Sequence, residues 1–484
     1  MKKIILSLLL FAGVIFPVVA QDVAEPVQLK HGAHRLGRRT DSDMQRWREH
    51  GLGQFIHWGV YAIPGGQWNG KVYGGAAEWI RSWKDMPKDE YDNLYKQFNP
   101  KQFNAKQWAK MAKDMGVKYM IITTKHHDGF CIWPSKYTEY NIRNTPYKKD
   151  ILKDIVDEYT KAGIDVHLYF SVMDWNYSGY RSSPPVTKED SVKYKSFLEF
   201  TRNQLIELLT NYPQAKGLWF DGTWDKAWGN EAEFCDNLEA EIRALSPGII
   251  IGSRFRADEF GKRHFDSNGN LIGDYNQLWE RKFPESVESL KGDDWDCVMT
   301  IPHNNWGYCA DWSNFYIKTP YELIGMMLKS VAMNGNFVVN FGPDGNGAFR
   351  PEERKIAEGI GKWMKENGEA VYGCTYSGIK NPDWGYYTKK GNKIYMTVFN
   401  RPVNNVLRIQ LPPALKMKPL NASFLINKQA LDLKLIRLGL DKDNNIYYEV
   451  TIPASFTSDM PFVIVLDIQQ EQDGKNAKEE DAMT

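Results

Sequence analysis

The sequence predicts an irregular (β/α)8-like, TIM-type barrel followed by an antiparallel β-sandwich domain. Three observations support this fold class. Helix and strand patterns alternate between residues 40 and 350. Several of these strands are continuous apolar runs, as expected for parallel strands that are buried on both faces. Beyond Cys374 the pattern changes to short segments with period-two alternation, separated by Gly, Asn and Pro, which is typical of antiparallel strands.

Residues 1–20 have the features of an export signal. Lys2 and Lys3 precede an apolar run over 4–19, and Ala20 ends a stretch of small residues at a suitable cleavage point. The alternative is a membrane anchor, but Gly13 and Pro17 interrupt the run, and it is shorter than the roughly 20 residues a spanning helix needs. We therefore expect export with cleavage, which places the mature chain in the periplasm or outside the cell, with no membrane span.

The barrel is expected over residues 21–370. Asn104 predicts the start of a helix over 105–115, Gly116 its end, and a strand over 117–124 follows. A first strand is expected over 53–56. The alternating pattern predicts further helices over 151–161, 191–212 and 351–366, and strands over 165–171, 217–221, 248–252, 297–301 and 336–341. An open doubly wound sheet is the alternative, but no glycine-rich dinucleotide loop follows the first strand. Eight complete units cannot be counted, so the barrel is expected to be irregular.

The sandwich is expected over residues 371–470. Its predicted strands are 393–399, 405–411, 421–426, 446–452 and 462–468. The charged segment 471–484 is expected to be a disordered tail.

The net charge and the cysteines indicate which partner is excluded and whether disulfides are expected. The net charge of +1 argues against a nucleic-acid partner, which would require a basic excess. The five cysteines show no CxxC spacing, and buried free thiols are expected, with a Cys297–Cys309 bridge as the alternative.

Polar or ionisable residues beside aromatic ones follow the predicted barrel strands. In a barrel such residues meet at the carboxyl ends of the strands. Aromatic faces pack on the apolar patches of a sugar while polar groups bond its hydroxyls, so the pattern indicates a sugar pocket. The residues at these ends are His57, His126, His127, Asp128, Ser171, Asp174, Trp175, Asp221, Trp224 and Arg254.

A hydrolytic metal site is the main chemical alternative, with His57, His126, His127, Asp128 and Asp221 as candidate ligands. Adjacent strand residues point to opposite faces, so His126 and His127 are expected to be a poor ligand pair. The usual zinc spacings and the Gly-x-Ser-x-Gly elbow of serine hydrolases are both missing from the sequence. We therefore expect no metal and no cofactor.

Several runs resemble the α-L-fucosidases of glycoside hydrolase family 29. They are Gly53–Gly59, Lys125–Phe130, Leu218–Gly222, Trp295–Ile301 and Gly335–Pro343, in the order of that family. The resemblance covers roughly residues 40 to 470. It implies the same barrel and sandwich, and retaining hydrolysis of terminal α-L-fucosides without a cofactor.

The resemblance also implies roles for individual residues. Asp221 matches the catalytic nucleophile of the family. Matches to its substrate-binding positions are His57, Trp79, His126, His127, Trp224 and Arg254. The third strand end reads Tyr169-Phe170-Ser171 and departs from the family pattern, so neither Tyr169 nor Phe170 is assigned a role.

The resemblance also implies the acid/base, because many members of the family have a Glu shortly after a Gly-Asp-Tyr run. Here Glu280 follows Gly273-Asp274-Tyr275, in a segment expected to be a loop, and is assigned this role. Glu285, Glu288 and Asp296 stay open as alternatives. Retention requires two carboxyls about 5 to 5.5 Å apart. One anion raises the pKa of the other carboxyl, and Trp279 is expected to desolvate Glu280 and raise its pKa further. Arg254 is expected to lower the pKa of Asp221 or to orient Glu280.

The predicted function is therefore an exported, retaining exo-α-L-fucosidase that acts on fucosylated oligosaccharides or glycoconjugates. Two alternatives remain: a non-catalytic glycan-binding protein on the same scaffold, and a metal-dependent hydrolase. The first would lack a second carboxylate facing Asp221.

Overall fold

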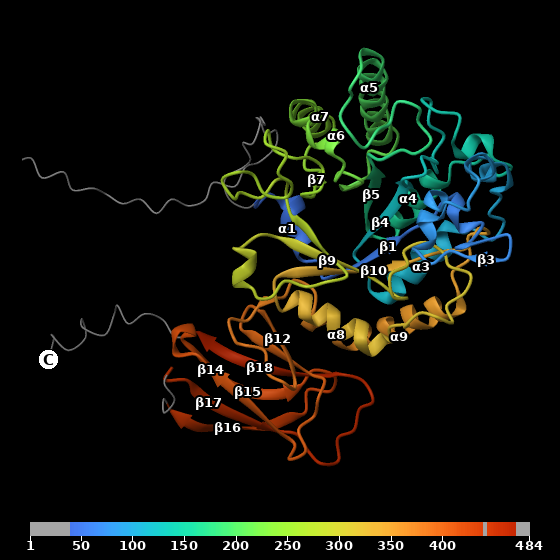
Figure 1. The fold of residues 1–484 in the computed structure, drawn as a ribbon. Helices are drawn as coiled ribbons and strands as arrows, with labels where there is room; N and C mark the ends of the chain where they lie inside the picture. Colours follow the sequence, from blue (N-terminus) through green and yellow to red (C-terminus); the bar gives the residue numbers. More distant parts are fainter. Residues whose placement is uncertain (1–38, 439–442, 471–484) are drawn as a thin grey trace, which may run out of the picture.

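The computed structural model describes residues 39–438 and 443–470, which form a barrel and a smaller β domain (Figure 1). The predicted export signal 1–20 and the predicted tail 471–484 lie outside the described residues. Among the described helices, none combines the length and the apolar character needed to cross a membrane.

The barrel is a parallel eight-stranded sheet in the order β7-β6-β5-β4-β1-β10-β9-β8. Every strand predicted for the barrel is present, and one further strand of this sheet, β8, was not predicted. The strands are β1 (Leu52–Ile56), β4 (Tyr119–Lys125), β5 (Asp165–Ser171), β6 (Gly217–Asp221), β7 (Ile250–Ile251), β8 (Asn276–Glu280), β9 (Trp295–Thr300) and β10 (Gly335–Phe341).

The two edge strands of the sheet meet and close the barrel. Gly252 and Tyr275 form a parallel bridge just beyond β7 and just before β8, and Ser253 N–H donates to the Tyr275 carbonyl at 2.9 Å. Within residues 252–294, all of which are described, no α-helix connects β7 to β8 or β8 to β9. The barrel is therefore irregular, as expected, where β7, β8 and β9 follow one another without connecting α-helices.

Helices cover the outside of the barrel (Figure 1). Asn104 caps α3 by accepting from Gln107 N–H, and Gly116 ends it with a φ of 92°, as the sequence predicts. The long helices are α3 (Ala105–Met115), α4 (Ile151–Lys161), α5 (Lys188–Asn211), α7 (Ala232–Leu245), α8 (Pro320–Val331) and α9 (Pro351–Asn367). Shorter elements are α1 (Ser42–Arg48), α2 (Lys88–Asp92), α6 (Lys226–Gly229), β2 (Gln67–Trp68) and β3 (Lys71–Val72).

The inside of the barrel is filled by large side chains. Phe55, Tyr119, Tyr169, Trp219 and Val338 come from five different strands and belong to one buried cluster. The outward faces of the same strands pack under the helices in a second, larger cluster. Burial on both faces explains why these strands are continuous apolar runs in the sequence.

The C-terminal domain is an antiparallel sheet of eight strands in the order β11-β12-β13-β18-β15-β16-β17-β14. β16 pairs with β15 through Ala430 and Leu431 and with β17 through later residues, so it joins the two layers around one apolar core. The strands are β11 (Thr375–Tyr376), β12 (Gly385–Lys390), β13 (Lys393–Val398), β14 (Val406–Leu411), β15 (Met417–Phe424), β16 (Ala430–Leu438), β17 (Ile446–Thr451) and β18 (Phe462–Gln470).

The two parts pack through α8 and α9, which lie between the barrel and the C-terminal sheet (Figure 1). Trp363 of α9 donates from its indole N–H to the Pro461 carbonyl at 2.7 Å. The five cysteines are buried free thiols, so the predicted alternative of a Cys297–Cys309 bridge is wrong.

Candidate active site

A cavity of about 260 Å³ lies at the carboxyl ends of the barrel strands. Seven of the eight predicted site residues line it, and Arg254 contacts two of them. The lining residues are Phe55, His57, Ala76, Glu78, Trp79, His126, His127, Trp219, Asp221, Trp224, Glu280, Arg281, Asn304 and Trp306. Its volume lies below the roughly 300–1,000 Å³ of sites for drug-sized ligands and suits one sugar residue.

Asp221 ends β6 and is held by two donors. Tyr169 O–H donates to Oδ2 at 2.8 Å, and Arg254 donates from Nη1 to Oδ1 at 3.1 Å. Gly222 follows with a φ of 72°, and a Cβ there would lie 2.6 Å from the Cβ of Met173. The turn that presents Asp221 to the cavity therefore requires glycine at position 222.

Glu280 is the last residue of β8, not a loop residue as predicted. Arg254 donates from Nη2 to its Oε2 at 2.5 Å, so one guanidinium joins Glu280 and Asp221 in the same cavity. Trp279 packs on Trp295 with ring centroids 6.3 Å apart and does not line the cavity. Neighbouring residues of a strand point to opposite sides. The prediction that Trp279 desolvates Glu280 is therefore wrong.

The sequence predicts a lowered pKa for Asp221 and a raised pKa for Glu280, and the structure shows the opposite shifts. Burial raises the pKa of Asp221 above its usual value, although the charge of Arg254 opposes this. Burial also acts on Glu280, but the charge and hydrogen bond of Arg254, with Arg281 and His57, hold its pKa below its usual range. The difference arises because Glu280 is the closer partner of Arg254. Two carboxyls that share one cation titrate as a pair.

The alternative acid/base residues lie elsewhere. Glu285 and Glu288 are exposed and do not line the cavity. Asp296 lies near the amino end of β9, and burial raises its pKa to about 7. Tyr119 O–H lies 3.5 Å from its Oδ2. Because the cavity is at the carboxyl ends of the strands, Asp296 is at the wrong end of the barrel to reach it.

His57 follows β1 and presents a hydrogen-bond acceptor to the cavity. Its Nδ1 lies 2.7 Å from Oδ1 of Asn340, and the amide of Asn340 donates from Nδ2 to the Trp306 carbonyl. The Asn340 oxygen must accept, so Nδ1 carries the proton of the neutral ring and Nε2 accepts. Burial lowers the pKa of His57 to about 4 and keeps the ring neutral.

His126 and His127 both line the cavity, which contradicts the prediction that they point to opposite faces. Their ring centroids are 4.2 Å apart. The alternation ends because β4 stops at Lys125, with a register irregularity between Thr123 and Lys125, so both histidines lie in the following turn. Burial lowers both pKa values, that of His127 to about 3.

Three groups in the cavity have the spacing of metal ligands. The candidate ligand atoms of His126, His127 and Asp221 lie within 4.8 Å of one another. Both oxygens of Asp221 already accept hydrogen bonds, one of them from the Arg254 cation. A guanidinium on the carboxylate opposes a second positive charge, so the local electrostatics favour a hydroxyl-binding role for these residues.

Aromatic rings form one wall of the cavity. The rings of Trp79 and Trp224 are nearly parallel, with an interplanar angle of 17° and centroids 6.3 Å apart. Trp175 meets Trp79 edge-on at 5.2 Å. Trp224 is 42% exposed, so it lies at the entrance. Such a wall suits the apolar face of a sugar.

The sequence reasoning missed Glu78, a fully buried carboxyl that lines the cavity. Gly307 N–H donates to its Oε2 at 2.9 Å, while Oε1 has no partner among the described residues. Burial raises its pKa to about 7. An unpaired buried carboxyl oxygen is costly unless a ligand satisfies it. Its position directly before Trp79 was the available signal.

Phe55 and Trp219, which line the cavity, were also missed, and Tyr169, which contacts Asp221, was considered but given no role. Each lies two positions before a residue at a strand end, namely His57, Ser171 and Asp221. Strand residues two apart share a face, so the period-two rule applied backwards from each strand end predicts all three. Trp306 lies in the loop after β9, and no comparable rule reaches it.

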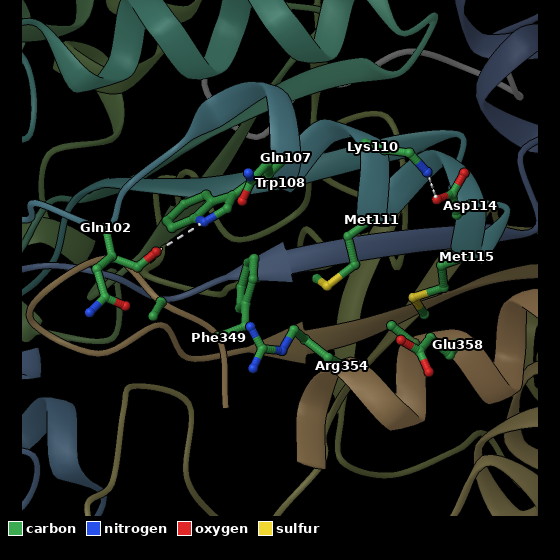
Figure 2. Close-up of a pocket in the computed structure, with 13 residues that line it drawn as sticks. Gln102, Gln107, Trp108, Lys110, Met111, Asp114, Met115, Phe349, Arg354 and Glu358 are labelled. Atoms are coloured by element: carbon green, nitrogen blue, oxygen red, sulfur yellow. Dashed lines mark hydrogen bonds and ion pairs between the residues drawn. The ribbon is translucent and has the colours of Figure 1, made fainter. Parts of the chain in front are cut away.

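A second cavity of about 460 Å³ lies on the outside of the barrel between α3 and α9 (Figure 2). Met111, Met115 and Phe349 form its apolar part, and Arg354 and Glu358 lie on exposed positions at its edge. It holds no histidine and none of the predicted site residues.

The chain matches known proteins over most of its length. Residues 27–369 match the family model described as Alpha-L-fucosidase. The tissue α-L-fucosidase of Homo sapiens is 29% identical over 381 residues, which cover 75% of this chain and 76% of that protein.

Solved structures are more similar still. A family 29 α-L-fucosidase from Bacteroides thetaiotaomicron has a TM-score of 0.86 and 49% identity, and the match covers 93% of this chain and 99% of that one. Another structure of a family 29 enzyme from that organism, with the same TM-score and identity, covers 92% of this chain and 100% of that one. It is a covalent intermediate, trapped with 2-fluoro-fucosyl fluoride by means of a glutamate-to-glutamine mutant.

Proposed function

Because the chain belongs to the α-L-fucosidase family of glycoside hydrolases, we propose that it removes terminal α-L-fucosyl residues from glycans with retention of configuration. The observation that carries this proposal is the guanidinium of Arg254, which joins Asp221 and Glu280 in one cavity. A second carboxylate beside Asp221 is the feature that separates a hydrolase from a glycan-binding protein on the same scaffold.

In the first step, an oxygen of Asp221 attacks the anomeric carbon and forms a glycosyl ester, while the bond to the leaving oxygen breaks. Glu280 gives its proton to that oxygen, and the aglycone departs as an alcohol. The pair must therefore hold one proton, and the productive arrangement places it on Glu280. The trapped intermediate of the B. thetaiotaomicron relative supports this route.

In the second step, water attacks the anomeric carbon of the ester. Glu280, now ionised, takes a proton from the water, and Asp221 leaves as a carboxylate. This transfer leaves Glu280 protonated for the next cycle, and fucose is released. Tyr169 and Arg254 donate to Asp221 and stabilise the charge that it regains.

The shape and polarity of the cavity favour a single terminal sugar. Nε2 of His57 is an acceptor, and Oε1 of Glu78 has no partner among the described residues, so both can bond sugar hydroxyl groups. The tryptophan wall suits the apolar side of a deoxy sugar. We infer exo action because the cavity has room for about one ring.

We also propose export, with residues 1–20 as the cleaved signal. Lys2 and Lys3, followed by the apolar run 4–19, support it. N-terminal sequencing of the protein from a periplasmic fraction should begin at Gln21, and a chain that retains Met1 in the cytoplasm would contradict the proposal.

The proposed activity is tested with an aryl α-L-fucoside monitored by ¹H NMR. The first sugar product should be the α-anomer, before mutarotation, because two inversions give net retention. Initial release of the β-anomer would contradict the covalent mechanism. No turnover of any α-L-fucoside would contradict the proposed activity as a whole.

A further inference from the structure

Arg281 follows Glu280 directly and has an unusual backbone. Its φ is 56°, in the left-handed region that non-glycine residues seldom occupy. Its N–H donates to the Val298 carbonyl at 2.9 Å, which holds this conformation. Strained residues of this kind cluster at ligand-binding and catalytic sites, so its side chain is a candidate for function.

The side chain of Arg281 lines the cavity, and its guanidinium donates no hydrogen bond to any of the described residues. The guanidinium carbon lies 5.8 Å from the ring centroid of Trp306, and Nη2 lies 3.7 Å from Oε1 of Glu280. At 3.7 Å this contact is longer than a hydrogen bond. The side chain is 37% exposed. The guanidinium of Arg254, by contrast, donates hydrogen bonds to two carboxylates, those of Asp221 and Glu280.

The position of Arg281 relative to Glu280 identifies which part of the substrate it faces. Oε2 of Glu280 accepts from Arg254, so Oε1 is the oxygen free to protonate the leaving group. Arg281 lies on the Oε1 side. Its guanidinium therefore points to where the aglycone must lie, and Asn304 adds a neutral amide to the same cavity lining.

We propose that Arg281 forms a leaving-group subsite that favours fucosides whose aglycone carries a carboxylate or a sulfate. The planar guanidinium matches either anion with paired hydrogen bonds. The inference rests on the proposed fucosidase activity and specifies a substrate class for it.

The test compares two substrates, 3-carboxyphenyl and 3-carbamoylphenyl α-L-fucoside, which differ in the charge on the aglycone. The wild type, Arg281→Met and Arg281→Lys are assayed with both. Relative to Arg281→Met, the wild type should favour the carboxylate by about two- to fivefold in kcat/KM, as for an exposed ion pair. Arg281→Lys should keep part of this preference, and 0.5 M NaCl should reduce it.

Arg354→Met is the matched control. It removes one positive charge at the separate cavity between α3 and α9 (Figure 2) and should leave the substrate ratio unchanged. If Arg281→Met lowers kcat/KM for both substrates by the same factor, the residue only positions Glu280, and the subsite proposal is wrong. Absence of turnover of both substrates by the wild type would instead contradict the fucosidase activity.

Discussion

Tyr169 O–H donates a 2.8 Å hydrogen bond to Oδ2 of Asp221, across neighbouring strands of the barrel. Burial keeps the pKa of Tyr169 well above its usual value, so the phenol remains a donor. The bond fixes the carboxylate and leaves Arg254 to bridge its other oxygen to Glu280. A rigid, charged carboxylate is what a glycosidase nucleophile requires.

Replacing Asp221 with Asn should lower kcat by about three orders of magnitude or more, because the amide cannot form the glycosyl ester. The assay is turnover of an aryl α-L-fucoside, with the melting temperature as the control for folding. Turnover near that of the wild type would remove Asp221 from the nucleophile role.

Glu280→Gln should slow substrates with poor leaving groups far more than activated aryl fucosides, because only the former need a proton from the acid. Azide should partly restore turnover of the activated substrates, since it needs no base. The exposed Glu285→Gln and Glu288→Gln variants are matched controls and should retain activity. Loss of activity in either control, with Glu280→Gln unaffected, would transfer the role to that residue.

Arg254→Met should move both limbs of the pH–activity profile to higher pH. The Arg254 charge lowers the pKa of Asp221 and of Glu280, so removing it raises both. The acid limb rises because Asp221 must be ionised, and the alkaline limb rises because Glu280 must be protonated. Arg281, whose charge also lowers the pKa of Glu280, remains in the variant, and so does the His57 ring. An unshifted profile would show that Arg254 does not set these values.

Prolonged chelation should leave activity unchanged, although His126, His127 and Asp221 have ligand-like spacing. The reason is the Arg254 guanidinium on Asp221, which opposes a bound cation. Activity is measured after dialysis against EDTA, and metal content by elemental analysis. Stoichiometric zinc, together with loss of activity that zinc restores, would support the metal-dependent alternative.

Asp296→Asn should change how stability depends on pH while leaving activity within a few-fold, because Asp296 does not line the cavity. Burial raises its folded-state pKa from 3.8 to about 7. Between these values the unfolded chain releases the proton and the folded chain keeps it. Wild-type stability should therefore fall relative to the variant from about pH 4 to pH 7, by up to about 1.4 kcal/mol per pH unit.

Urea unfolding at pH 4.5, 6 and 7.5 measures this change. The exposed Glu285→Gln variant is the control and should follow the wild type across the same range. A constant difference between Asp296→Asn and wild type would show that the carboxyl does not titrate differently in the folded state.

The sequence determined the elements that depend on local chemistry. The cap at Asn104, the end of α3 at Gly116 and the bounds of α4 were all predicted, because caps, glycine and helical periodicity act within a few residues. It also predicted which strand ends carry polar groups. The strand ends were enough to bring His57, His126, His127, Asp221, Trp224 and Arg254 to one site. Trp79 and Glu280 were assigned from the family resemblance, and they lie in the same site.

Only the tertiary structure decided the remaining features of the site. Glu280 ends a strand because β8 pairs with β9, a contact between segments separated by a long irregular connection that no local signal predicts. The opposite pKa shifts of Asp221 and Glu280 arise from burial and from their unequal distances to Arg254. Burial and charge separation are set by residues far apart in the chain, so neither follows from a sequence motif.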